Sequence, residues 1–104
     1  IPNGGQRKKL QAARLQKQGV RAGYPDINVD MEAVAPGWDA YIGLRIEMKR
    51  PIVKGEDKPK VGAQQIQWLD RLQAAGYCCC VCYGVDEAKA ATEAYMAGQR
   101  VPHQ

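Results

Sequence analysis

Three charged residues have types and spacing that suit hydrolytic chemistry: Asp26, Glu47 and Lys49. Asp26 opens an alternating stretch that we expect to be a short strand. Glu47 and Lys49 end the next predicted strand on one face, because side chains two residues apart in a strand point to the same side. If these strands pair antiparallel, the start of the first lies beside the end of the second. The pattern therefore predicts that the three side chains meet.

Two carboxylates beside a lysine can support metal-assisted hydrolysis. Carboxylate oxygens suit Mg²⁺ or Mn²⁺, which keep several waters and also bind substrate phosphate. Such an ion polarises a phosphoryl oxygen and acidifies a water, and Lys49 can orient or deprotonate that water. The alternative is a solvent-facing strand that carries these charges without forming a site. Spacing alone favours the alternative, because short motifs recur by accident.

Hydrophobic periodicity predicts the element order α-β-β-α-β-α in one domain over residues 1–104. The expected helices cover residues 5–18, 62–75 and 86–96, and the expected strands cover residues 26–30, 40–49 and 77–85. Residues 31–39 are interpreted as a hairpin-like connection, residues 50–61 as an exposed mobile loop, and residues 98–104 as a polar tail. The apolar strand at 77–85 is expected at the sheet centre, and Asp86 is expected to cap the last helix.

The cysteines and the apolar runs bear on the cellular setting. All four cysteines lie within residues 78–82, and the single histidine is His103. We interpret the cysteines as small apolar residues in a buried strand rather than a zinc site, and their density favours a reducing, cytoplasmic setting. No apolar run approaches the ~18 residues of a membrane span, and no signal peptide is recognisable.

Charge is distributed unevenly along the chain. Residues 1–21 contain six basic residues and no acidic one, whereas the remainder contains nine basic and eleven acidic residues, so the net +4 is +6 from the front and −2 from the rest. A basic front suggests a polyanionic partner. A solvated, Lys/Arg-rich helix face is the other interpretation, and charge alone leaves both open.

The ordered set of motifs resembles a known nuclease family. Pro25-Asp26 followed by Glu47-Met48-Lys49 resembles the PD-(D/E)XK signature. Further landmarks narrow the resemblance to the VRR-NUC group, the virus-type replication-repair nucleases. They are Pro2-Asn3-Gly4-Gly5 before a basic helix, Gly19 through Asp26, Gly43 through Arg50, Gln65-x-x-Trp68-Leu69 and Gly76-Tyr77. They span nearly the whole chain in the right order.

The resemblance implies a fold and a set of roles. The fold would be an α/β sandwich with a restriction-endonuclease-like core, its central mixed sheet flanked by helices. Asp26 and Glu47 would bind Mg²⁺ or Mn²⁺ with the backbone carbonyl of Met48, and Lys49 would be the catalytic lysine. Gln65 would orient Lys49 or the attacking water. Without the resemblance, Gln65 would be interpreted as an exposed helix amide.

The implied activity is metal-dependent cleavage of structured or branched DNA, including four-way (Holliday) junctions, by a homodimeric phage or bacterial enzyme. The cut would leave a 5′-phosphate and a 3′-hydroxyl. The residues expected to grip DNA phosphates are Arg7, Lys8, Lys9, Arg14, Lys54, Lys58 and Lys60. A non-catalytic nucleic-acid-binding module, or an interaction domain of a larger repair protein, are the alternatives.

One departure from the family concerns the acidic residues. Related nucleases often carry a further carboxylate on a helix before the catalytic core, yet no Asp or Glu precedes Asp26 here. We expect either that such a helix lies upstream of Ile1, consistent with the absent initiator Met, or that the site works without it.

Overall fold

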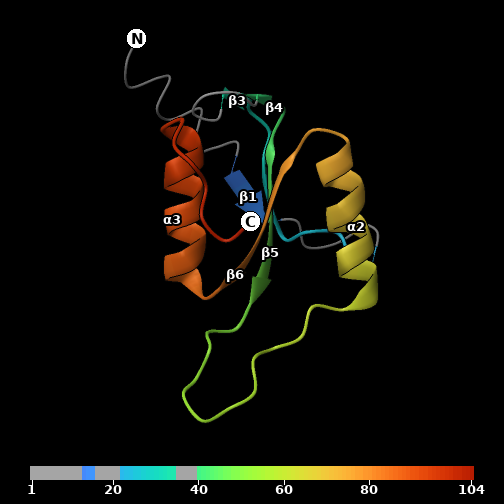
Figure 1. Cartoon of the computed structure of the whole chain (residues 1–104), viewed down its shortest axis with the longest axis vertical. Coiled ribbons are helices and arrows are strands. Elements are labelled where there is room, and N and C mark those ends of the chain that lie inside the picture. Colours follow the sequence, from blue (N-terminus) through green and yellow to red (C-terminus); the bar gives the residue numbers. More distant parts are fainter. Residues whose placement is uncertain (1–12, 16–21, 35–39) are drawn as a thin grey trace.

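Two helices flank a mixed β-sheet in the computed structural model, which describes residues 13–15, 22–34 and 40–104 (Figure 1). In chain order the elements are β1 (Ala13–Leu15), β2 (Ile27–Val29), β3 (Ala33–Val34), β4 (Ala40–Tyr41), β5 (Leu44–Lys49), α2 (Ala63–Ala74), β6 (Cys78–Tyr83) and α3 (Val85–Met96). The larger sheet has the order β1-β2-β5-β6, with β5 and β6 parallel and the other pairs antiparallel. The helix α2 lies on one side of β5 and β6, and α3 lies on the other. The expected α/β sandwich with a flanked mixed sheet is confirmed.

The strand β5 is buried on both faces, which explains why it carries both core and site residues. Leu44 and Ile46 pack with Val29 and the cysteines of β6 beneath α3. Arg45 and Glu47 point to the opposite face and are also buried. Cys78, Cys80 and Cys82 have almost no exposed surface, and all four cysteines are free thiols, so their interpretation as buried small residues is confirmed.

The predicted helix over residues 5–18 is wrong where the structure describes it, because Ala13–Leu15 form β1 and pair with β2. The rest of that helix lies outside the described residues. Helix propensity is a weak preference that tertiary pairing can override. The apolar stripe of Leu10 and Ala13 is interrupted by Lys17, so a helix there would have little to bury.

The predicted strand over residues 40–49 is two strands. Ala40–Tyr41 pairs with β3 in a hairpin, which confirms the hairpin-like connection, and Leu44–Lys49 joins the main sheet. Between them the Ile42 N–H donates to the Gly76 carbonyl at 3.0 Å. Gly43 packs so closely on Tyr77 that a Cβ would lie 2.8 Å from a ring carbon. This contact fixes the break, and alternation along the sequence does not reveal it.

The strand β6 lies at an edge of the described sheet rather than at its centre, where β5 lies. The last residues of the sequence cover this edge, since the Val81 N–H donates to the His103 carbonyl at 3.2 Å and Val101 is buried. The polar tail therefore docks on β6 through Val101 and the His103 carbonyl, although its other side chains are exposed, and its backbone satisfies a group that an edge strand would otherwise leave open. The predicted cap is also wrong, because Gly84 is the N-cap of α3 and Asp86 lies in the first turn.

The described part of the chain contains no helix that is both long and apolar enough to cross a membrane.

Candidate active site

The pairing of β2 with β5 places Asp26 beside Glu47. Ile27 lies opposite Ile46 and Val29 lies opposite Leu44, so the next position before β2 lies opposite Glu47. An Asp26 carboxylate oxygen, Oδ2, accepts the Met48 N–H at 2.8 Å. The antiparallel arrangement that the sequence suggested is confirmed, and with it the approach of Asp26 to the end of β5.

Gln65 of α2 connects Glu47 and Lys49 in one hydrogen-bonded network. Its Nε2 donates to Glu47 Oε2 at 2.8 Å, and its Oε1 accepts the Lys49 ammonium at 2.8 Å. The same Oε1 accepts the backbone N–H of Gly62 at 2.7 Å, which fixes the amide at the start of the helix. Lys49 Nζ also lies 3.9 Å from Glu47 Oε2. Gln65 is thus partly buried at the cluster and is not a solvent-exposed helix amide.

Glu47 lies in an environment that disfavours its charge. Only 4% of its side chain is exposed. Burial, and then the neighbouring Asp26, raise the pKa of Glu47 to about 7, although Lys49 acts in the opposite direction. Its Oε1 atom is buried and has no hydrogen-bond partner within the described residues. A buried oxygen of this kind costs free energy unless another group satisfies it.

The oxygens gathered here fit a hard divalent cation. Glu47 Oε1 is buried without a partner beside the Asp26 carboxylate, and carboxylate oxygens are the donors that Mg²⁺ and Mn²⁺ prefer. Within residues 13–15, 22–34 and 40–104, no group of three His, Cys, Asp or Glu side chains could hold a metal. Protein donors at this place are therefore two carboxylates and any backbone carbonyl, a small set that suits an ion retaining several waters.

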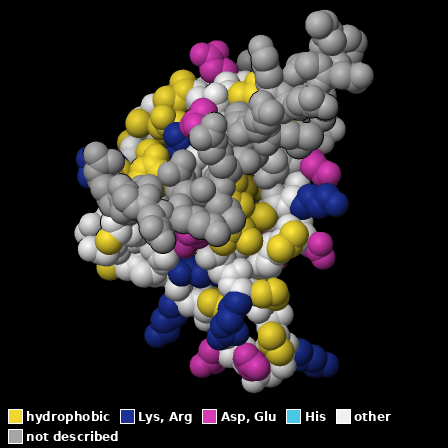
Figure 2. All heavy atoms as spheres, turned by 180° about the vertical axis from the view of Figure 1, so that it is seen from behind, with side chains coloured by type: hydrophobic (Ala, Val, Ile, Leu, Met, Phe, Trp, Pro, Cys, Tyr) yellow, Lys and Arg dark blue, Asp and Glu magenta, His cyan; other side chains and the backbone are white. Residues whose placement is uncertain are grey.

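Three of the lysines predicted to bind DNA lie on one exposed loop next to the cluster. The loop of residues 50–62 follows Lys49 and ends at Gly62, which donates to Gln65, so both ends of the loop adjoin the network. The loop projects from the body of the molecule, and its basic and acidic side chains are intermixed (Figures 1 and 2). Lys54, Lys58 and Lys60 are all exposed on it.

The remaining residues predicted to bind DNA are less well defined. Arg14 lies in β1 opposite Asn28. Arg7, Lys8 and Lys9 lie outside the described residues.

Arg45 holds the strands next to the cluster, and the sequence interpretation did not single it out. It is 6% exposed, and its guanidinium donates to the Tyr24 hydroxyl at 3.2 Å and pairs with Asp30 at 3.0 Å. Its planar head also lies 4.1 Å from the centre of the Tyr77 ring. Arg45 therefore ties β5 to both sides of β2. The sequence offered one indication that Arg45 is buried, because this charged residue lies between the core residues Leu44 and Ile46.

Residues 22–24 dock onto α2 and so fix the approach of the chain to Asp26. The Trp68 indole N–H donates to the Ala22 carbonyl at 3.2 Å, and the Tyr24 and Trp68 rings meet edge to face at 5.1 Å. Gly23 has a φ of +83°, and a Cβ there would lie 2.7 Å from Gln64 Cβ. Gly23, Tyr24 and Trp68, the last distant in sequence from the other two, therefore form one packed contact between residues 22–24 and α2.

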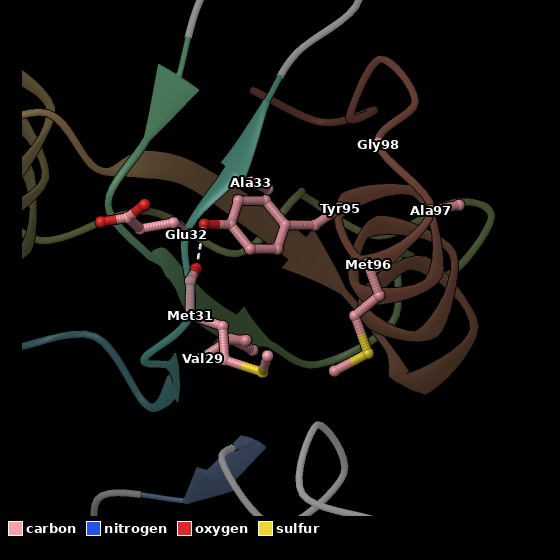
Figure 3. A pocket seen from close by; sticks show the side chains of 8 residues that line it. All are labelled: Val29, Met31, Glu32, Ala33, Tyr95, Met96, Ala97 and Gly98. Carbon is pink, nitrogen blue, oxygen red and sulfur yellow. Dashed lines mark hydrogen bonds between the residues drawn. The ribbon is translucent and has the colours of Figure 1, made fainter. Parts of the chain in front are cut away.

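A cavity of about 280 Å³ lies at the α3 side of the sheet, away from the cluster (Figure 3). The Tyr95 hydroxyl donates to the Met31 carbonyl beside it. The residues that line the cavity are Val29, Met31, Glu32, Ala33, Tyr95, Met96, Ala97 and Gly98. None of the predicted catalytic, metal-binding or DNA-binding residues lines this cavity.

Comparison with solved structures finds the same fold in a known domain. No protein-family model matches the sequence, and no curated protein matches it. A solved structure described as a VRR_NUC domain protein superposes with a TM-score of 0.69 at 26% sequence identity, over 92% of this chain and 78% of that one. The chain therefore has the fold of a VRR-NUC domain. The fold agrees with the resemblance in sequence motifs, and both point to a nuclease-type domain.

Proposed function

We propose that this VRR-NUC domain is a Mg²⁺- or Mn²⁺-dependent endodeoxyribonuclease that hydrolyses phosphodiester bonds in structured or branched DNA. The observation that carries the proposal is the buried, unpartnered Glu47 Oε1 beside Asp26, in a network that also holds Lys49 and Gln65. A strand that merely displayed charge to solvent would not bury these groups or join them through one amide.

Asp26 and Glu47 would hold the ion, with the Met48 carbonyl as a third donor. The Met48 N–H points toward Asp26, and the N–H and carbonyl of one strand residue face the same edge. The Met48 carbonyl therefore faces the Asp26 side of β5. When bound, the ion would supply charge stabilisation at a phosphoryl oxygen and an acidified water.

Lys49 and Gln65 would position the attacking water. Gln65 Oε1 fixes the Lys49 ammonium at 2.8 Å, and Gly62 fixes the Gln65 amide in turn. A pre-oriented ammonium needs little reorganisation as negative charge develops on the phosphate. The loop of residues 50–62 directly follows Lys49, so its lysines would contact phosphates flanking the cut.

The experiment is cleavage of a four-way junction, a flap and a linear duplex by the wild-type protein in Mg²⁺, in Mn²⁺ and in EDTA. We expect cutting of the branched substrates with either ion, products that carry a 5′-phosphate, and no cutting in EDTA. Asp26→Asn serves as the matched inactive variant. Binding of these DNAs without cutting at any metal would favour a non-catalytic nucleic-acid-binding module instead.

A further inference from the structure

A second hollow, of about 340 Å³, lies one strand further along the sheet from the catalytic cluster. Its walls come from the loop of residues 50–62, the strand β6, the start of α3 and the last residues of the sequence. The lining residues are Ile52, Lys58, Val61, Val81, Tyr83, Glu87, His103 and Gln104. None of them belongs to the cluster formed by Asp26, Glu47, Lys49 and Gln65.

The sheet register places this pocket next to the cluster. Glu47 lies beside Val81, and Lys49 lies beside Tyr83, in the parallel pairing of β5 with β6. Paired residues of neighbouring strands point to the same face, and neighbouring strands lie only about 4.8 Å apart. A nucleotide adjacent to a phosphate at Lys49 therefore reaches the pocket without leaving this face.

The lining chemistry combines an aromatic face with a cation. The ring of Tyr83 is partly exposed, and Lys58 Nζ lies 4.6 Å from its centre. Ile52, Val61 and Val81 supply apolar wall. Bases stack on aromatic side chains, whereas lysines contact the phosphate backbone. An inorganic anion would gain nothing from the apolar wall, and an apolar ligand would gain nothing from Lys58, so the combination fits a nucleotide.

The wall that carries Tyr83 is held in place by the protein itself. The Tyr83 N–H donates to Glu87 Oε1 at 2.9 Å, and His103 Nδ1 lies 3.5 Å from the same oxygen. The Val81 N–H donates to the His103 carbonyl at 3.2 Å. The backbone of this wall is therefore in place before any ligand arrives, which lowers the ordering cost of binding.

We propose that this pocket takes one unpaired nucleotide beside the scissile phosphate. Its base stacks on Tyr83 in the place that the Lys58 ammonium takes in the free protein, and Lys58 moves to its phosphate. The proposal deepens the proposed nuclease function and rests on it for the position of the cut. A base inside a duplex is stacked on its neighbours and cannot offer its face to Tyr83. The pocket thus selects DNA that has an unpaired base next to the cut, as at a flap or a junction.

The test measures DNA binding in EDTA, where no metal-dependent cutting occurs. A fluorescent flap DNA carries one abasic site, which is moved one nucleotide at a time along the unpaired strand from the branch. For the wild-type protein we expect one position at which loss of the base weakens binding about tenfold, the size of one base–aromatic stack. Tyr83→Leu should bind the intact and abasic DNAs equally, and Tyr83→Phe should restore the difference.

The matched pair Lys58→Ala and Lys54→Ala serves as a second measurement that does not depend on the fold of β6. Both lysines are exposed on the same loop, but only Lys58 lies over Tyr83. We expect Lys58→Ala to weaken flap binding more than Lys54→Ala does. Equal effects of the two changes, or a Tyr83→Leu protein that still senses the abasic site, would overturn the proposal.

The same proteins are assayed for cutting in Mn²⁺, so that the two proposals fail separately. If the protein cuts flap DNA but shows no position sensitive to base loss, the nuclease proposal stands and the proposal of a nucleotide pocket fails. If the protein senses one base through Tyr83 but does not cut, the pocket stands as a nucleotide site and the nuclease proposal fails.

Discussion

Glu47 is pulled in opposite directions by its surroundings. Burial and the charge of Asp26 oppose its ionisation, whereas Lys49 favours it, and the resulting pKa is about 7. Near neutral pH a substantial fraction of the metal-free protein therefore holds a proton at Glu47. A cation between Asp26 and Glu47 would displace that proton, so metal binding and ionisation are coupled at this residue.

The raised pKa of Glu47 predicts a fall in metal-free stability as pH rises from about 4.5 to about 7. In this window the native state binds more protons than the unfolded state, so the free energy of unfolding decreases with pH. Glu47→Gln lacks the titrating group and should not show this component. The measurement is urea unfolding of both proteins in EDTA across the window, and parallel pH profiles for the two would contradict the prediction.

At the residue scale, the sequence predicted the gathering of Asp26, Glu47 and Lys49 but not its consequences. Alternation and antiparallel pairing were sufficient to bring these side chains together, because register follows from local periodicity. The burial of Glu47 and the three bonds of Gln65 depend on how α2 packs on β5. Spacing carries no information about that packing, and Gln65 was identified only through its family resemblance.

The segments on either side of β2 are held by contacts to β5 and α2. Arg45 reaches Tyr24 and Asp30, and Trp68 reaches Ala22. These contacts fix the short strand β2, and with it Asp26, against the rest of the fold.

Arg45→Met should destabilise the protein by about 1–3 kcal/mol. The change removes buried bonds, but Asp30 is 64% exposed in its side chain and stays hydrated, which limits the cost. The control is Arg50→Met, since the Arg50–Glu56 pair is exposed at both partners and should contribute less than about 0.5 kcal/mol. Urea unfolding at neutral pH compares the two, and equal losses would contradict the role of Arg45.

Gly23→Ala should cost at least about 1 kcal/mol more than Gly55→Ala. Both glycines have a positive φ, at +83° and +87°, so both substitutions carry backbone strain. Only at Gly23 would the new methyl also collide with α2, because nothing lies within 4 Å of a Cβ at Gly55. Thermal or urea unfolding measures the difference, and a Gly23→Ala protein as stable as Gly55→Ala would show that residues 22–24 do not dock as described.

The elements themselves were predicted where local pattern determines them. The helix α2 and the strand β6 lie close to their expected positions, since each has a continuous pattern bounded by glycine. The break before β5 depends on the contact of Gly43 with Tyr77, and the strand at Ala13–Leu15 depends on its pairing with β2. The docking of Val101 and His103 depends on β6. Partners distant in sequence decide these features, so periodicity alone missed them.

At the scale of the whole molecule, the loop of residues 50–62 brings basic residues to the edge of the candidate site. It carries four basic and two acidic residues, and Arg50 is paired with Glu56. The lysines of this loop are exposed, and the loop itself projects beyond the helices (Figure 1).

Combined replacement of Lys54, Lys58 and Lys60 by alanine should weaken DNA binding most at low salt. Each phosphate contact that is lost should reduce the slope of log affinity against log salt by about one unit. Lys89→Ala is the control, because Lys89 is equally exposed but lies on α3, on the opposite side of the sheet from α2. Fluorescence anisotropy over a salt series measures the slopes, and an unchanged slope for the triple variant would exclude the loop from the DNA interface.

Lys49→Ala tests the central claim most directly, in single-turnover cleavage of branched DNA with Mn²⁺. The account predicts a loss of at least about a hundredfold in cutting rate, with DNA affinity and unfolding free energy close to wild type. Lys60→Ala, on the adjoining loop, should retain the rate once DNA is saturating. Near-wild-type cutting by Lys49→Ala would contradict the assignment of the Asp26–Glu47–Lys49–Gln65 cluster as the nuclease centre.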